Sequence, residues 1–102
     1  MDKTVNFDLT GKVAVVTGAS RGLGVELATS LAEYGADLAL MAGNEEKMKK
    51  VAADISGKTG AKVITVKVNI SNEENVREAV AAVMKEYGRI DILVNNAGII
   101  RY

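Results

Sequence analysis

The chain alternates short, continuous apolar runs with segments whose apolar residues recur at helical spacing. The continuous runs, which are typical of strands buried on both faces, are residues 13–16, 38–41 and 92–94. A further strand is predicted at residues 63–68, where the polar Thr65 and Lys67 alternate with aliphatic residues. This alternation places one face or edge of the strand in water, so we expect it at the edge of a sheet.

Amphipathic helices are predicted between these strands. Their apolar positions are Leu23, Leu27, Leu31 and Tyr34 in the first, Met48, Val51, Ala52 and Ile55 in the second, and Val76, Val80, Val83, Met84 and Tyr87 in the third. Glycines are expected to end them, at Gly35, at Gly57 and Gly60, and at Gly88. Asn44 is a candidate N-cap of the second helix, and Ser71-Asn72-Glu73-Glu74 is predicted to open the third as a capping box.

The order of these elements predicts the topology. Strands and helices alternate, and the helices are long enough for right-handed crossovers between parallel strands. We therefore expect an α/β fold, one half of a doubly wound parallel sheet with strand order 3-2-1-4 and three crossover helices. The apolar strand 92–94 then needs a further neighbour, because an uncovered apolar edge is an aggregation hazard. We interpret residues 1–102 as an incomplete domain, completed by its own C-terminal half or by a second copy pairing at the fourth strand.

Composition excludes several functional classes. The 102 residues carry 13 Lys and Arg against 13 Asp and Glu, and this zero net charge argues against nucleic-acid and membrane partners. The absence of His and Cys excludes His-based triads, thiol nucleophiles, Cys/His zinc sites and disulfides, and no metal site is predicted. No apolar run has the length of a membrane span. The N-terminus lacks the pattern of a signal peptide, so a cytoplasmic location is expected.

A glycine-rich turn at residues 17–24 connects the first strand to the first helix. Gly18 permits the tight turn, and Gly22 and Gly24 leave no side chain where a pyrophosphate would approach or where the helix packs on the sheet. The helix N-terminus offers N–H groups and the positive end of its dipole to the phosphates. In a Rossmann sheet this strand–turn–helix context indicates dinucleotide binding, and a turn without a ligand is the alternative.

The spacing Gly-x-x-x-Gly-x-Gly and the segment Asn95-Asn96-Ala97-Gly98 resemble motifs of the short-chain dehydrogenase/reductase family. The resemblance extends over nearly the whole chain and implies an oxidoreductase that interconverts a secondary alcohol and a ketone. The flanking residues are similar to those of gluconate and deoxygluconate dehydrogenases and of 3-oxoacyl-acyl-carrier-protein reductases. The cofactor-binding residues implied by the resemblance are Gly18, Ser20, Arg21, Gly22, Leu23, Gly24, Asn69, Ile70, Asn96, Ala97 and Gly98. For Asn69 an ordinary strand-end cap is the alternative, and Asn95 is expected to help hold the central strands.

The ends of the second strand bear on the choice between NADP(H) and NAD(H). An NAD site needs a carboxylate at the C-terminal end of this strand, and Asp37 lies at the opposite end. Ala42, Gly43 and Asn44 should reach the ribose, and none of them is acidic, while Arg21 is able to pair with a 2′-phosphate. Many NADP-binding members of the family carry Arg where this sequence has Gly43, so a second clamp is missing. NADP(H) is favoured and NAD(H) remains possible.

The acid/base tyrosine of the family, with its lysine four residues later, is not found. Tyr34 is followed at that distance by Leu38 and Tyr87 by Asp91, and Tyr102 ends the sequence. Both internal tyrosines are interpreted as packing residues at helix ends. No catalytic residue is therefore predicted, and the chain alone is expected to transfer no hydride.

Two other classes of function are alternatives to an oxidoreductase. One is a non-catalytic nucleotide-binding or assembly module that completes its sheet with a partner chain, since a free strand edge can pair with another chain. The other is a nucleotide hydrolase with a Walker-type loop, which is disfavoured because Val25 and Glu26 follow Gly24 where Lys and Ser or Thr are required.

Overall fold

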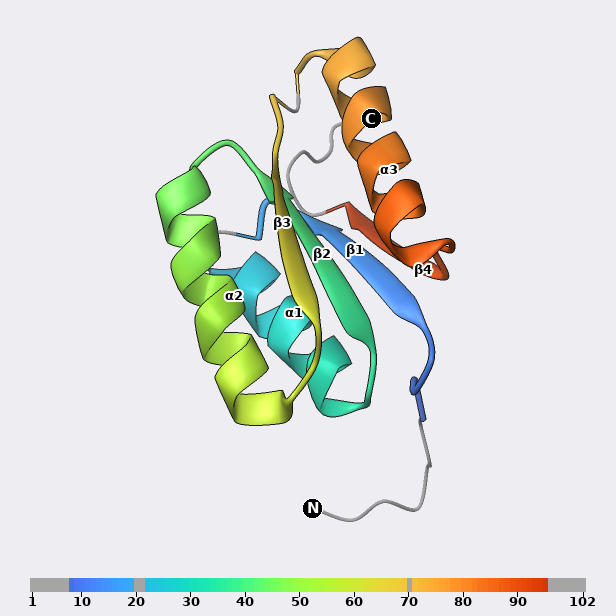
Figure 1. The fold of residues 1–102 in the computed structure, drawn as a ribbon. Helices are drawn as coiled ribbons and strands as arrows, with labels where there is room; N and C mark the ends of the chain where they lie inside the picture. The colour runs from blue at the N-terminus through green and yellow to red at the C-terminus, as the bar shows by residue number, and fades with distance from the viewer. Residues whose placement is uncertain (1–7, 20–21, 70, 96–102) are drawn as a thin grey trace.

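The computed structural model describes residues 8–19, 22–69 and 71–95 of the chain. Its elements follow in the order β1 (Val13–Thr17), α1 (Leu23–Glu33), β2 (Asp37–Ala42), α2 (Glu45–Thr59), β3 (Val63–Lys67), α3 (Glu73–Tyr87) and β4 (Ile92–Asn95). All strand pairs are parallel, and the strand order is β3-β2-β1-β4 (Figure 1). The predicted half of a doubly wound α/β sheet is confirmed.

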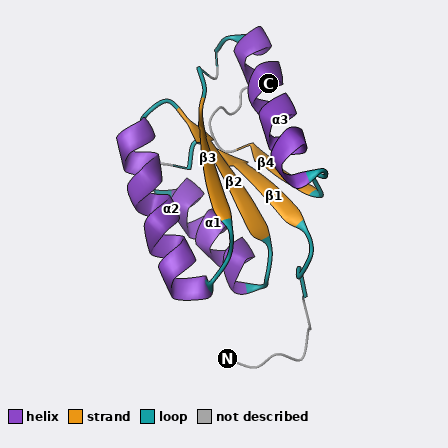
Figure 2. Cartoon of the chain, in the orientation of Figure 1, coloured by secondary structure: helices purple, strands orange, loops and turns teal. Residues whose placement is uncertain are grey.

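Helices cover both faces of the central strands, with α1 and α2 on one face and α3 on the other (Figure 2). The cluster beneath α1 and α2 includes Ala14, Val16, Leu38, Leu40, Met48 and Ile55. The cluster beneath α3 includes Val15, Ala39, Met41, Val68, Ala79 and Val83. Alternate residues of β1 and β2 enter the two clusters, which explains why these strands are continuous apolar runs.

The two outer strands are more exposed than the central ones. In β3 the residues up to Val66 are half-buried and Lys67 is exposed, which confirms the predicted edge position. β4 alternates half-buried and exposed residues, and Leu93 is 63% exposed. A hollow of about 190 Å³ beside it is lined by Thr17, Met41, Val76, Val80, Leu93 and Asn95. The described part of the chain therefore leaves an apolar surface at β4, as expected from its sequence.

The helices α2 and α3 begin at asparagine caps. The Asn44 side-chain oxygen accepts from the Lys47 N–H at 3.0 Å, which confirms Asn44 as the N-cap of α2. The predicted capping box at Ser71 is wrong, because the N-cap of α3 is Asn72, whose side-chain oxygen accepts from the Asn75 N–H at 3.0 Å. The Ser71 hydroxyl instead donates to the Asn69 side-chain oxygen at 2.8 Å.

The end of α2 also differs from the prediction. Gly57 lies inside the helix, and α2 ends at Gly60, whose φ of 79° is left-handed. Gly60 leaves the right-handed region and ends the helix, whereas Gly57 lies within it at a cost of about 1 kcal/mol relative to alanine.

Two predicted core-facing side chains are exposed instead. Leu23 is 60% exposed and Met84 is 43% exposed. The buried residues of α1 are Gly24, Ala28 and Ala32, and those of α3 are Ala79 and Val83. Leu23 and Met84 thus lie at the border of the buried face, directly beside Gly24 and Val83, which are buried.

Tyr87 has a structural role at the amino-terminal edge of the sheet. Its hydroxyl lies 2.7 Å from the carbonyl oxygen of Leu38 and 3.0 Å from that of Lys62, so it donates to backbone between β2 and β3. Burial, followed by the nearby carboxylates of Asp37 and Glu86, raises the pKa of the Tyr87 hydroxyl. A phenol held neutral as a donor fits the predicted packing role.

Candidate functional site

The candidate site is the carboxyl edge of the sheet, where the ends of parallel strands meet. The glycine-rich turn follows β1, Gly43 and Asn44 follow β2, and Val68 and Asn69 follow β3. Because β1 and β2 pair in register, and β2 and β3 do so as well, these segments lie side by side at one edge (Figure 1). In open α/β sheets, ligands bind at this edge.

The turn after β1 places an open backbone at the start of α1. The Gly18 N–H donates to the Met41 carbonyl at 2.8 Å, which ties the turn to β2. Gly22 is the N-cap of α1 with φ 60° and ψ −134°, a conformation that L-residues rarely adopt. A Cβ built at Gly22 would meet nothing within 4 Å. The glycine is therefore required by the backbone, and the space in front of it is free for an approaching anion.

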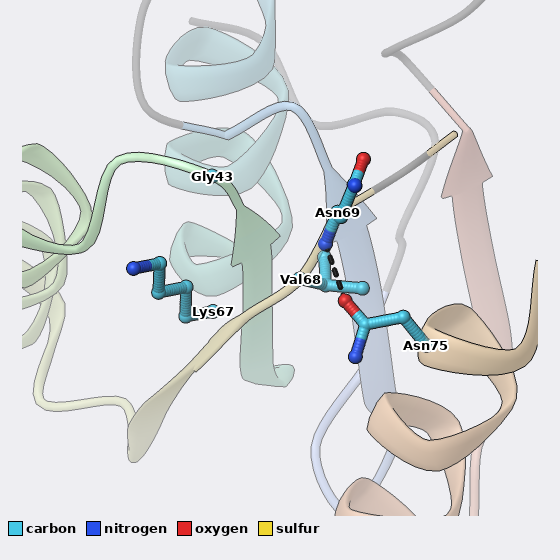
Figure 3. Close-up of a pocket in the computed structure, with 5 residues that line it drawn as sticks. All are labelled: Gly43, Lys67, Val68, Asn69 and Asn75. Atoms are coloured by element: carbon cyan, nitrogen blue, oxygen red, sulfur yellow. Dashed lines mark hydrogen bonds between the residues drawn. The ribbon is translucent and has the colours of Figure 1, made fainter. Parts of the chain in front are cut away.

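An open pocket of about 530 Å³, within the range of ligand sites, lies at the same sheet edge, where β2 and β3 end. Its lining residues are Gly43, Lys67, Val68, Asn69 and Asn75 (Figure 3). The Val68 N–H donates to the Ala42 carbonyl at 3.0 Å, and the Asn69 N–H donates to the Asn75 side-chain oxygen at 2.6 Å. These bonds fix the pocket wall to β2 and to the first turn of α3.

The Asn69 side chain is engaged in a local turn. Its oxygen accepts from the Ser71 N–H at 3.1 Å and from the Ser71 hydroxyl at 2.8 Å. This is the strand-end cap that the sequence left open, and the residue lines the pocket as well. The cap is therefore confirmed, and a contact of Asn69 with the adenine stays a prediction.

Sequence reasoning did not identify Lys67 and Asn75 as site residues. Asn75 could have been suspected because it lies in the first turn of a helix, and asparagine favours caps and turns over helix interiors. Lys67 could have been suspected from the strand register, which places it opposite Ala42, next to Gly43. Neither signal is sufficient without the three-dimensional arrangement.

Asn95 joins β4 to the centre of the sheet. The Thr17 hydroxyl lies 3.1 Å from the Asn95 side-chain oxygen and 3.3 Å from the Val94 carbonyl. This contact confirms the expectation that Asn95 helps to hold the central strands.

Half of the residues predicted to bind the cofactor lie within the described part of the chain. Those at the carboxyl edge are Gly18, Gly22, Leu23, Gly24, Asn44 and Asn69. Those outside the described residues are Ser20, Arg21, Ile70, Asn96, Ala97 and Gly98. Asp37 lies at the opposite edge, where its side chain accepts from the Lys62 N–H at 3.0 Å, so it belongs to the sheet edge as predicted.

Perturbed ionisable groups gather at the amino-terminal edge, away from this pocket. The Arg89 guanidinium, together with the Val13 N–H, holds the pKa of the Asp91 carboxyl below its usual value. The Lys62 ammonium likewise lowers the pKa of the Glu86 carboxyl.

Comparison with known proteins identifies the family. The model of the short chain dehydrogenase family matches residues 12–102. The chain belongs to this family. Among curated relatives it is 45% identical over 97 residues to the 3-oxoacyl-acyl-carrier-protein reductase FabG of Chlamydia muridarum, covering 95% of this chain and 39% of that protein. It is 42% identical over 95 residues to the gluconate 5-dehydrogenase of Gluconobacter oxydans, covering 93% of this chain and 37% of that one.

Solved structures of the family resemble the chain closely. The L-sorbose reductase of Gluconobacter frateurii, complexed with NADPH and L-sorbose, has a TM-score of 0.87 and 37% identity over 92% of this chain and 36% of that chain. An NAD⁺-bound xylitol dehydrogenase has a TM-score of 0.85 and 36% identity over 89% of this chain and 35% of that chain. The sequence thus spans about two-fifths of the length of the relatives it matches. The resemblance stated from its motifs is confirmed.

Two further findings concern the described residues alone. Their helices lack the combination of length and apolar composition that crossing a membrane requires. Within the same part of the chain, no group of three or more His, Cys, Asp or Glu side chains is arranged to hold a metal ion.

Proposed function

We propose that residues 1–102 form the dinucleotide-binding half of a short-chain oxidoreductase that prefers NADP(H). The observation that carries this proposal is the N-cap of α1, Gly22, whose backbone conformation favours glycine and leaves room for an anion. It lies at the same sheet edge as the 530 Å³ pocket. The bound nicotinamide would donate a hydride to a ketone in its reduced form, or accept one from a secondary alcohol in its oxidised form. The chain's own residues would hold and orient the cofactor.

Each part of the edge fits one part of a dinucleotide. The residues from Gly18 to Gly24 would receive the pyrophosphate at the helix N-terminus, where backbone N–H groups and the helix dipole favour anions. The pocket between Gly43 and Asn75 would receive the adenosine. By family resemblance Ser20, Arg21, Asn69 and Ile70 would join this part, and Asn96, Ala97 and Gly98 would lie along the cofactor.

The proposed preference for NADP(H) rests on the residues at the end of β2, none of which carries a negative charge. An NAD site places a carboxylate there to accept from the ribose 2′-OH. Gly43 and Asn44 occupy these positions, and none of the described residues that line the pocket is acidic. Solved relatives hold either NADPH or NAD⁺, so the preference follows from this chain's own residues.

Catalysis would need residues beyond those found in this chain. No tyrosine here is followed by a lysine four positions later, so the chain alone would transfer no hydride. The substrate of the completed protein would be of the sugar-acid or 3-oxoacyl type, in line with the relatives named above. The apolar surface at β4 would pair with the chain's own C-terminal half or with a second copy.

A non-catalytic module is the second candidate function. The observation that favours it is the outer strand β4, whose Leu93 is 63% exposed and whose free edge is able to pair with a partner chain. The two functions differ in activity after addition of a C-terminal half. A reductase half regains carbonyl-dependent NADPH oxidation, whereas an assembly module forms a defined complex without it.

Removal of the Arg21 side chain tests the NADP(H) preference. We expect Arg21→Ala to weaken NADPH binding by about tenfold or more, because a charge-assisted bond to phosphate is lost, and to leave NADH binding nearly unchanged. Dissociation constants for both nucleotides, measured by calorimetry, give the ratio. Arg77→Ala is the matched control, since Arg77 is an exposed α3 residue paired with Glu73. Equal losses of NADPH and NADH affinity would contradict the role of Arg21 at the 2′-phosphate.

A further inference from the structure

Lys67 lies next to Gly43, the position where many NADP-binding members of the family carry an arginine. Lys67 is the last residue of β3 and pairs in register with Ala42, the residue before Gly43. Both Lys67 and Gly43 line the 530 Å³ pocket. Figure 3 shows the Lys67 side chain extending from β3 on the Gly43 side of the pocket, while Asn69 and Asn75 lie on the other side.

The alternation of β3 sets the face on which Lys67 lies. Ile64 and Val66 pack into the cluster beneath α3, and Val63 packs into the cluster beneath α1 and α2. Since successive strand residues point to opposite faces, Lys67 shares the face of α1 and α2 with Val63. Helix α1 packs on this same face, so the ammonium of Lys67 lies next to the end of β2 on the side of the sheet where α1 begins.

The charge of Lys67 is uncompensated within the described residues. The lysines paired with carboxylates there are Lys49, Lys58 and Lys62, and Lys67 has no such partner within 4 Å. The nearest acidic residues along the chain from Gly43 are Glu45 and Glu46, which do not line the pocket, and Glu45 pairs with Lys49 at 3.7 Å. An exposed ammonium at the border of a pocket whose described lining contains no acidic residue favours an anionic ligand.

Gly43 leaves room for such a ligand between Lys67 and the end of β2. A Cβ at this position would meet only the Val68 carbonyl oxygen, at 3.8 Å, which is ordinary contact. The glycine is therefore not required by crowding, and its effect is to leave the space next to Lys67 without a side chain. A phosphate group fits this combination of open space and an adjacent ammonium.

We propose that Lys67 is a specificity-determining residue that binds the 2′-phosphate of NADP(H), in place of the arginine absent at residue 43. The inference rests on the proposed dinucleotide site and adds a second cation to Arg21. In this arrangement the positive charge comes from Lys67 on β3 and not from a residue at the end of β2. Lys67 then discriminates between NADPH and NADH and takes no part in the chemistry of hydride transfer.

The test compares charge-removing and charge-keeping variants of the full chain. Lys67→Gln is expected to weaken NADPH binding by about tenfold and to change NADH binding by less than about twofold, because only NADPH carries the 2′-phosphate. Lys67→Arg should keep the preference. Lys85→Gln is the matched control, since Lys85 lies in the last turn of α3, away from the pocket. Calorimetry gives both dissociation constants, and circular dichroism verifies the fold of each variant.

A compensating substitution makes the test more stringent. Gly43→Arg in the Lys67→Gln background should restore NADPH affinity, since it returns a cation to the same space. Unchanged NADPH affinity in Lys67→Gln, or equal losses for NADPH and NADH, would overturn the role of Lys67 while the dinucleotide site stands. Failure of the unsubstituted chain to bind either nucleotide would instead overturn the proposed function together with this inference.

Discussion

Replacement of Gly22 by valine is expected to abolish dinucleotide binding, lowering the affinity for both NADPH and NADH by about 100-fold or more. Gly22 is the N-cap of α1, and the space in front of it is empty to beyond 4 Å. A valine side chain would occupy the space where the pyrophosphate approaches the backbone. Both nucleotides carry this group, so both should lose affinity equally. Calorimetric titration of the folded variant measures the loss.

Backbone strain needs its own control, because valine at φ 60° is unfavourable even without a ligand. Gly11 provides it, with φ 85° and no atom within 4 Å of a built Cβ, before β1 at the opposite edge of the sheet. Gly11→Val and Gly22→Val should each cost about 1–2 kcal/mol of stability. Only Gly22→Val should lose the dinucleotide. Normal binding by Gly22→Val, or equal loss in both variants, would contradict a pyrophosphate site at Gly22.

Truncation of Leu40 is expected to cause a large loss of stability. Leu40 lies in β2, is fully buried, and packs with Val16, Met48 and Ile55 in the cluster beneath α1 and α2. Leu40→Ala removes buried methyl groups and leaves a cavity, which costs about 2–5 kcal/mol in comparable cores. Since small domains are stable by about 5–15 kcal/mol, much of the folding free energy would be lost. Urea unfolding followed by circular dichroism measures the change.

Leu93 is the matched control for this prediction, because it is also a strand leucine but is 63% exposed. Leu93→Ala should cost less than about 1 kcal/mol in the isolated chain, since little apolar surface is uncovered. A small effect of Leu40→Ala would contradict the packing described for the core. A large effect of Leu93→Ala would show that β4 is covered in solution, which would favour pairing with a second copy.

The fold followed from the sequence because each level of pattern pointed to the same arrangement. Continuous apolar runs marked β1 and β2 as central strands, and the Thr65 and Lys67 alternation marked β3 as an edge. The cap at Asn44 and the glycine-rich turn also fell where local chemistry requires them. Agreement between propensity, capping and periodicity is what specifies a single fold.

The errors arose where several positions satisfy the same local rule. Ser71 and Asn72 are both residues that favour the N-cap. The Ser71 hydroxyl donates to Asn69, and Asn72 caps the helix by accepting from the Asn75 N–H. Leu23 and Met84 fit a helical apolar face, but the residues beside them, Gly24 and Val83, are the ones that are buried. Helical periodicity predicts a broad stripe and does not determine which residues at its border are buried.

The candidate site was also predictable only in part. The glycine-rich turn was recognisable because its chemistry is contained in one segment. The pocket was not, since Gly43, Lys67 and Asn75 come from three separate segments. Only the register of β2 with β3 and the bond from Asn69 to Asn75 bring them together. Sites that depend on pairing between strands therefore need the structure.

Direct titration of the unsubstituted chain with NADPH, and with NADH in parallel, tests the central claim that this sheet edge is a dinucleotide site. The arrangement of Gly22, Gly43 and the pocket predicts saturable binding with one nucleotide per chain and a lower dissociation constant for NADPH than for NADH. Circular dichroism on the same sample establishes that the chain is folded. Absence of binding of either nucleotide to the folded chain would contradict the account.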